Sequence, residues 1–97
     1  MIEITNNNIN DEFKNAVIDF YSPTCMPCRK MMPVLKELEK DYKNISFYKV
    51  NAVENPEFVN KFQVQGLPTI IVLKDGIVKE KFVGLQSKSK IKEVLGE

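Results

Sequence analysis

Hydrophobic and polar positions alternate along the chain in a way that predicts a succession of strands and helices. A short apolar–polar–apolar pattern at 2–4 predicts a first strand, and a polar stretch with a helical turn at 11–14 is expected after it. The unbroken apolar and aromatic run at 16–21 predicts a strand that is covered on both faces of a sheet. Asp19 is the one charge within that run.

The longest helix is expected from residue 27 to about residue 42. Its apolar side chains recur at steps of four, three and four, as on one face of an amphipathic helix: Met31, Leu35, Leu38 and Tyr42. Pro33 falls inside this segment, where it removes one backbone hydrogen bond and is expected to kink the helix.

The same patterns predict three more strands and two more helices, with strands at 45–50, 69–73 and 77–83, and helices at 56–62 and from Ser87 or Ser89 to Gly96. Asp75-Gly76 between two apolar runs is typical of a hairpin, so the last two strands are expected to be antiparallel neighbours. This order predicts an α/β fold with a single mixed sheet of four to five strands. A parallel half and a C-terminal antiparallel hairpin would be flanked by three to four helices on both faces.

Composition favours a single domain spanning 1–97. The chain is 43% hydrophobic and 28% charged, close to the average of soluble globular proteins. Fourteen Lys and Arg residues against 13 Asp and Glu give a net charge of +1, which excludes the basic footprint of a nucleic-acid binder. No segment is apolar enough for an export signal or a membrane span, so a cytoplasmic location is expected.

Two cysteines stand in the motif Cys25-Met26-Pro27-Cys28, where the buried strand ends and the long helix begins. At a helix N-terminus, unpaired backbone N–H groups and the helix dipole favour a thiolate, so Cys25 is predicted to be the nucleophile. Cys28 lies one helical turn further on and is predicted to be the resolving thiol. Pro27 fits the first helical turn and stiffens the ring that forms when the pair is oxidised to a disulfide.

A metal site and a pair of inert cysteines are the alternative interpretations of this motif. Zinc requires about four nitrogen or sulfur ligands, whereas the chain has two Cys and no His, so no metal is expected within one chain. The lack of His also excludes a Cys-His hydrolase, and leaves a carboxylate, a lysine or water as the proton acceptor.

Beyond the cysteines, further short motifs occur in the order and spacing of the thioredoxin family, which the chain resembles from about residue 16 to its end. They are Val17-Ile18-Asp19-Phe20-Tyr21, Cys25 to Lys30, Pro33, Lys49-Val50-Asn51, Asn55-Pro56, Val64-Gln65-Gly66-Leu67-Pro68-Thr69, Lys74-Asp75-Gly76 and Val83-Gly84. The resemblance implies the thioredoxin fold and a role in dithiol–disulfide exchange.

The resemblance also implies roles for single residues. Asp19 matches the buried acid that takes a proton from the resolving cysteine, and Lys49 matches the lysine near that acid. Residue chemistry agrees, since a carboxyl group inside an apolar strand has a raised pKa and can accept a proton near neutral pH.

A substrate-binding groove around Cys25 is implied as well. Pro68 matches a proline with a cis peptide bond that faces the active site, and the backbone of Leu67, beside Gly66, would bind an extended substrate peptide. Val83, Gly84 and Ala52 match the rest of this groove.

Three positions depart from the family pattern. Thr24 and Met26 replace the Trp and Gly that usually flank the first cysteine, and Tyr21 stands where the family has another Trp. Thr24 and Met26 are therefore expected to reshape the contact surface, so the redox potential and the partners cannot be copied from the family.

The leading hypothesis is a protein-disulfide reductase that acts on disulfide-containing substrate proteins. No Gly-rich dinucleotide fingerprint occurs and no cofactor is expected, so electrons would arrive from a flavin-containing thioredoxin reductase, as the resemblance implies. The glycine pair of glutaredoxins and the His of disulfide-forming relatives are missing, and a scaffold has no need of these chemical groups. A monomer is the expected state.

Overall fold

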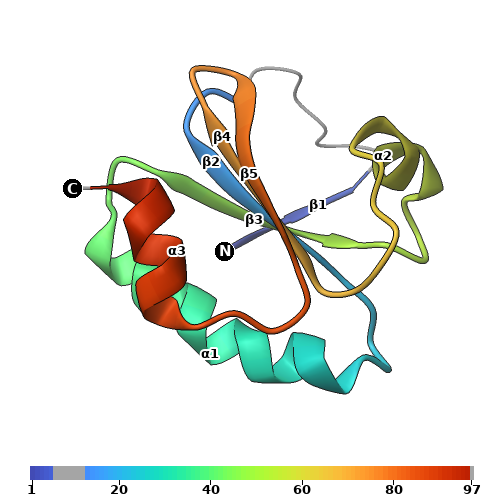
Figure 1. Cartoon of the computed structure of the whole chain (residues 1–97). Coiled ribbons are helices and arrows are strands. Elements are labelled where there is room, and N and C mark those ends of the chain that lie inside the picture. The colour runs from blue at the N-terminus through green and yellow to red at the C-terminus, as the bar shows by residue number, and fades with distance from the viewer. Residues whose placement is uncertain (6–12, 97) are drawn as a thin grey trace.

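Strands and helices form in the segments where the hydrophobic pattern predicts them (Figure 1). The computed structural model describes residues 1–5 and 13–96, and its elements are β1 (Ile2–Ile4), β2 (Ala16–Tyr21), α1 (Met26–Asp41), β3 (Ser46–Asn51), α2 (Pro56–Lys61), β4 (Thr69–Lys74), β5 (Ile77–Val83) and α3 (Lys88–Leu95). The helical turn predicted at 11–14 falls largely outside the described residues, and Phe13 and Lys14 belong to no helix.

The strand β2 lies at the centre of one five-stranded sheet. It pairs in parallel with β3 and antiparallel with β4, and the outer strands β1 and β5 complete the order β1-β3-β2-β4-β5. Because β1 runs parallel to β3 and β5 antiparallel to β4, the predicted mixed sheet with a parallel half and a C-terminal hairpin is confirmed.

The hairpin between β4 and β5 turns through Asp75 and Gly76. Both residues have positive φ angles, 54° and 80°. A two-residue turn of this kind requires left-handed backbone at both positions, which explains why the Asp-Gly pair predicts it correctly.

Helices cover both faces of the sheet, with α1 and α3 on one face and α2 on the other (Figure 1). Alternate residues of β2 point to opposite faces, so Val17 packs under α1 and α3, while Ile18 and Phe20 pack under α2. The first core includes Met31, Leu35, Leu38, Phe47, Ile70 and Ile91, and the second includes Ile4, Val50, Phe58 and Ile71.

The helix α1 begins at the cysteine motif and continues through Pro33 to Asp41. Its buried residues include the apolar stripe that predicts it, since Met31, Leu35 and Leu38 are all inaccessible to solvent. The strand β3 starts at Ser46, one residue later than the predicted start at Ile45, because the N–H of Ile45 donates to the carbonyl of Tyr42 in a turn.

Strand directions bring four chain segments to one edge of the sheet. The C-terminal ends of β2 and β3 meet there because these strands are parallel, with Tyr21 beside Asn51. The start of β4 and the end of β5 meet at the same edge because both pairings are antiparallel, with Phe20 beside Thr69 and Thr69 beside Val83. The segments that follow β2, β3 and β5 and that precede β4 therefore leave the sheet at a common edge.

Replacing Leu35 by Ala tests the core under α1. This side chain is wholly buried, so its truncation removes apolar burial and leaves a cavity, and we expect the free energy of unfolding to fall by about 2 to 5 kcal/mol in urea denaturation. The neighbouring Lys36 is exposed, and Lys36→Ala is the matched control, with an expected change within about 0.5 kcal/mol. Equal losses in the two variants would contradict this packing.

Candidate active site

Cys25 and Cys28 are joined by a disulfide bond at the N-terminus of α1, with their Cα atoms 5.2 Å apart. Cys25 is the N-cap residue, with extended backbone, and its Sγ accepts a hydrogen bond from the N–H of Cys28 at 3.2 Å. A sulfur atom in this place receives an N–H group that the helix itself leaves unpaired. In the reduced protein the same N–H and the helix dipole would stabilise a thiolate on Cys25.

The two sulfur-bearing residues differ in their access to solvent. Cys25 is half-buried, whereas Cys28 is 3% exposed and faces inward on α1. Cys25 is therefore the more accessible cysteine, and Cys28 is bonded to it from the protein interior.

Backbone and side-chain hydrogen bonds hold the segment between β2 and α1. The N–H of Cys25 donates to the carbonyl of Ser22 at 3.2 Å, and the Arg29 guanidinium donates to the carbonyl of Pro23 at 2.9 Å. The segment therefore presents Cys25 from a closed turn that is anchored to the first turn of the helix.

Asp19 lies in the middle of β2 and is completely buried, on the sheet face that α1 covers. Neither of its carboxyl oxygens has a hydrogen-bond partner among the described residues. Burial raises the pKa of Asp19 from 3.8 to about 7, although the positive charge of Lys49 opposes the shift and the negative charge of Glu3 adds to it. A carboxyl group with this pKa can take up or release a proton near neutral pH.

Lys49 stands beside Asp19 on the neighbouring strand β3. Its ammonium nitrogen is 3.8 Å from Oε1 of Glu3, which stands opposite it on β1. The lysine thus acts on Asp19 through its charge, while its ion pair is with Glu3.

The segments before β4 and after β5 lie together at the site edge of the sheet. The Leu67–Pro68 peptide bond is cis, and the carbonyl of Pro68 accepts a hydrogen bond from the N–H of Gly84 at 2.8 Å. A Cβ atom on Gly66 would lie 3.2 Å from Cγ1 of Val83, so the lack of a side chain lets the two segments approach. Gly84 has a φ of +90°, which favours glycine at this position.

Exposed side chains surround the cysteines. Thr24, Met26 and Pro27 are all exposed, and Met26 reaches 60%. Ala52 follows β3 at the same edge and donates its N–H to the carbonyl of Tyr21 at 2.8 Å. The predicted groove residues Gly66, Leu67, Pro68, Val83 and Gly84 belong to the neighbouring pair of segments at that edge.

Comparison with known proteins identifies the fold and its chemistry. The family model for thioredoxin matches residues 3–97. The chain belongs to the thioredoxin family. Similar proteins include the thioredoxins of Staphylococcus saprophyticus and Staphylococcus haemolyticus, each 38% identical over 98 residues, which cover 98% of this chain and 94% of each relative.

Solved structures agree with this assignment. The oxidised form of mitochondrial thioredoxin 3 from Saccharomyces cerevisiae is similar with a TM-score of 0.86 and 28% identity, over 98% of this chain and 92% of that chain. The thioredoxin of Fasciola hepatica is similar with a TM-score of 0.78 and 30% identity, over 88% of this chain and 81% of that one. With its Cys25–Cys28 pair, the chain is a thiol–disulfide oxidoreductase of the protein-disulfide reductase type.

Metal-binding clusters and membrane-spanning helices are both absent from the described residues. Within residues 1–5 and 13–96, no group of three or more His, Cys, Asp or Glu side chains is placed to hold a metal ion. In the same part of the chain, no helix has the length and the apolar character needed to cross a bilayer.

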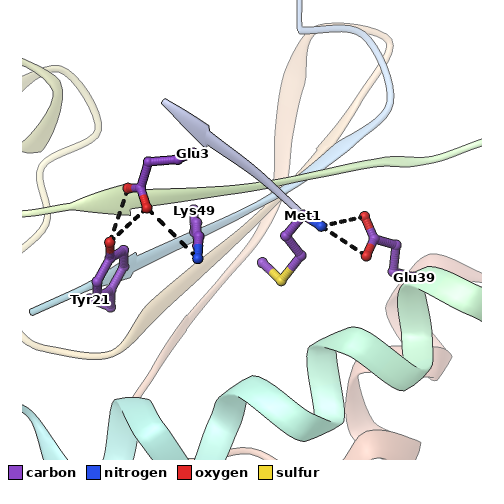
Figure 2. Close-up of polar contacts among 5 residues, drawn as sticks. All are labelled: Met1, Glu3, Tyr21, Glu39 and Lys49. Atoms are coloured by element: carbon purple, nitrogen blue, oxygen red, sulfur yellow. Dashed lines mark hydrogen bonds and ion pairs between the residues drawn. The ribbon is translucent and has the colours of Figure 1, made fainter. Parts of the chain in front are cut away.

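Glu3 is the charged residue of this region that sequence reasoning does not single out. Its carboxylate accepts a hydrogen bond from the Tyr21 hydroxyl and pairs with Lys49 (Figure 2). Lys49 is in register with Asp19, and Tyr21 follows Asp19 by two residues on β2. Glu3 lies between two isoleucines of a short strand, and this alternation predicts that Glu3 faces away from Ile2 and Ile4. The alternation does not identify the strand that pairs with β1.

Stability should depend on pH through Asp19. In the unfolded chain this carboxyl group loses its proton near pH 3.8, whereas in the folded oxidised protein it keeps the proton until about pH 7. Between these values the folded state binds more protons at Asp19, so the contribution of Asp19 to the free energy of unfolding is expected to fall by about 4 kcal/mol as pH rises from 3.8 to above 7.

Asp19→Asn should remove this fall, because the amide carries no proton that titrates in this range. Denaturant unfolding of the oxidised protein at intervals between pH 4 and pH 8 measures the effect, with Asp41→Asn as an exposed control that should keep the dependence of the parent chain. Parallel curves for the parent and the Asp19→Asn variant would show that Asp19 titrates normally.

Proposed function

We propose that the chain reduces disulfide bonds of other proteins in two exchange steps. In the first, the Cys25 thiolate attacks one sulfur of the substrate disulfide, so that a mixed disulfide forms and the other substrate sulfur leaves as a thiolate. In the second, the Cys28 thiolate attacks Sγ of Cys25 and releases the second substrate sulfur. Two electrons pass to the substrate, and Cys25 and Cys28 end as a disulfide.

The position of the Cys25–Cys28 disulfide carries this proposal, since it lies at a helix N-terminus and next to the sheet face that holds a buried carboxyl group. Cys25 is the more exposed cysteine, which suits the attack on a protein substrate. Cys28 is buried and needs a nearby base, because a thiol inside apolar surroundings gives up its proton reluctantly. Asp19, with a pKa of about 7, is a base of suitable strength.

The substrate chain is proposed to bind across the segments at the site edge. Gly66, Leu67 and cis Pro68 form one side, and Val83 and Gly84, tied to Pro68 by a backbone hydrogen bond, form the rest of that side. Backbone groups of Leu67 would pair with an extended substrate segment, as in the addition of a short strand. Ala52, Thr24, Met26 and Pro27 would contact the substrate around Cys25.

A separate flavin-containing thioredoxin reductase is proposed to return the oxidised pair to the dithiol. The chain carries no dinucleotide-binding fingerprint, so its electrons have to come through protein contact. We propose that the protein acts in the cytoplasm, because a reducing compartment keeps a lone catalytic pair available as a dithiol. We also propose that it acts as a monomer.

Substitution of each cysteine tests the order of the two steps. In an insulin-reduction assay with dithiothreitol, Cys25→Ser is expected to lose catalysis, whereas Cys28→Ser should form mixed disulfides that persist on a non-reducing gel. Lys43→Ala, exposed beyond the other end of α1, is the control and should keep the parent activity. Full activity of Cys25→Ser would refute the role of Cys25 as the nucleophile. Mixed disulfides trapped by Cys25→Ser in place of Cys28→Ser would reverse the roles of the two cysteines.

The role of Asp19 is tested by the rate of the second step. Single-turnover release of a labelled substrate from the mixed disulfide is expected to be roughly tenfold or more slower at pH 7 in Asp19→Asn than in the parent chain. In the parent this rate should rise with pH as Asp19 loses its proton near pH 7, and the variant should lack that rise. If both proteins release the substrate at the same rate, Asp19 is not the proton acceptor.

A further inference from the structure

A row of three charged side chains crosses the parallel half of the sheet. The register pairs Glu3 of β1 with Lys49 of β3, and Lys49 with Asp19 of β2. Neighbouring strands are about 4.8 Å apart, and residues in register on parallel strands point to the same face. The lysine therefore stands between two carboxyl groups, one at the rim of the sheet and one inside it.

The contacts of this row are unequal. The Lys49 ammonium pairs with Oε1 of Glu3 (Figure 2), and the two atoms are 3.8 Å apart. Both side chains are partly open to solvent, with 33% of Lys49 and 39% of Glu3 exposed. The carboxyl oxygens of Asp19, which is wholly buried, have no hydrogen-bond partner among the described residues. The cation is thus bound to the outer carboxylate rather than to the inner one.

The Tyr21 hydroxyl holds the outer carboxylate in place. It lies 2.8 Å from Oε1 and 3.0 Å from Oε2 of Glu3 (Figure 2). Tyr21 follows Asp19 by two residues on β2, so it projects to the same face of the sheet. Burial, followed by the hydrogen bond to Glu3, raises the pKa of Tyr21 to about 12, so the hydroxyl remains a donor throughout the neutral range.

We propose that Glu3 is a positioning residue of the redox site: its carboxylate, held by the Tyr21 hydroxyl, keeps the Lys49 ammonium away from Asp19 and so sets how readily Asp19 binds a proton. The consequence for catalysis rests on the proposed role of Asp19 as the acceptor of the Cys28 proton.

Two electrostatic effects of Glu3 act in the same direction. Its negative charge disfavours a second negative charge on Asp19, and its ion pair with Lys49 neutralises part of the charge that would favour one. Because Glu3 and Lys49 are partly exposed, solvent screens both effects, and a moderate influence is expected.

Few other groups can produce the same effect at Asp19. On its second neighbouring strand, β4, the residue in register is the apolar Ile70. On its own strand the nearest polar side chain on that face is Tyr21. The buried residues of the covering helix α1 are Cys28, Met31, Leu35 and Leu38, and Cys28 does not titrate while it is bonded to Cys25. In the part of the chain that the structure describes, the charged groups that shift the pKa of Asp19 are Lys49 and Glu3.

The proton affinity of Asp19 can be measured directly in the oxidised protein by a carbon-detected NMR titration of its carboxyl group. The chain has no His, and both cysteines are bonded, so the neutral range is almost free of other titrations. In Glu3→Gln the Asp19 midpoint is expected to fall by roughly 0.5 to 1 pH unit, because the charge is lost while an oxygen atom that can accept from Tyr21 remains. An unchanged or raised midpoint overturns the proposal.

Glu39→Gln is the matched control. Glu39 also ties β1 down through a carboxylate, which pairs with the amino group of Met1 at 3.0 Å, and the substitution changes the net charge by the same amount (Figure 2). The Asp19 midpoint should stay at its parent value in this variant. A fall equal to that in Glu3→Gln would mean that loosening β1 or changing the net charge is the cause, and would overturn the proposal.

The competition for Lys49 has a test of its own. In a Lys49→Met background, Glu3→Gln should lower the Asp19 midpoint by less than it does in the parent, since no cation remains to be released. An equal shift in both backgrounds would mean that Glu3 does not act through the lysine. Tyr21→Phe should also lower the midpoint, by less than Glu3→Gln, because the carboxylate loses its anchor and keeps its charge.

Kinetics separate this inference from the proposed function. If Asp19 accepts the Cys28 proton, the pH at which the resolving step reaches half of its maximal rate falls in Glu3→Gln by the amount measured in the titration. If the Asp19 midpoint shifts in Glu3→Gln but the pH dependence of the resolving rate does not, the result supports the positioning role of Glu3 and shows that Asp19 does not accept the Cys28 proton. If the Asp19 midpoint is unshifted in Glu3→Gln while the resolving step is slow in Asp19→Asn, the positioning role of Glu3 is overturned and Asp19 keeps its role as proton acceptor.

Discussion

A buried carboxyl group that has no hydrogen-bond partner within residues 1–5 and 13–96 is the constraint on which the site depends. Asp19 occupies the central strand, with a paired strand on each side and helices over both faces, so no part of it reaches water. Such burial disfavours the charged form and destabilises the fold at neutral pH. The surrounding sheet and α1 supply the apolar packing that offsets this cost, and the same packing keeps the dielectric low around Cys28.

The topology brings the chemistry together at one edge. A purely parallel sheet would place the start of β4 at the far end, whereas the antiparallel pairing of β2 with β4 brings it next to the end of β2. The antiparallel β5 then returns to the same edge, where Gly84 bonds to Pro68. Segments that lie more than 50 residues apart in the sequence thus surround one helix N-terminus.

The local hydrophobic pattern predicts most of this structure, because the spacing of apolar residues along each helix and strand reflects which of its faces is buried. The position of the cysteine motif at a helix N-terminus could also be predicted, since the predicted strand ends directly before the motif and the amphipathic helix begins within it. The strand that pairs with β1 could not be predicted from the sequence. A three-residue strand with one charge carries no information about its partner, and only the pairing of β1 with β3 brings Glu3 next to Lys49. The position of Asp19 was predictable, but its electrostatic surroundings were not.

Proton chemistry and partner contact are separated in space in the proposed mechanism. Glu3, Lys49, Asp19 and Tyr21 lie on strands of the sheet, whereas Met26 and Thr24 are exposed on either side of Cys25 in the chain. A change at Met26 alters the surface that a partner touches and leaves the charges near Asp19 as they are. A change at Glu3 does the reverse. In this proposal, the departure from the family at Met26 bears on which disulfides are reduced, and the contacts of Glu3 bear on the pH at which the reduced substrate is released from the mixed disulfide.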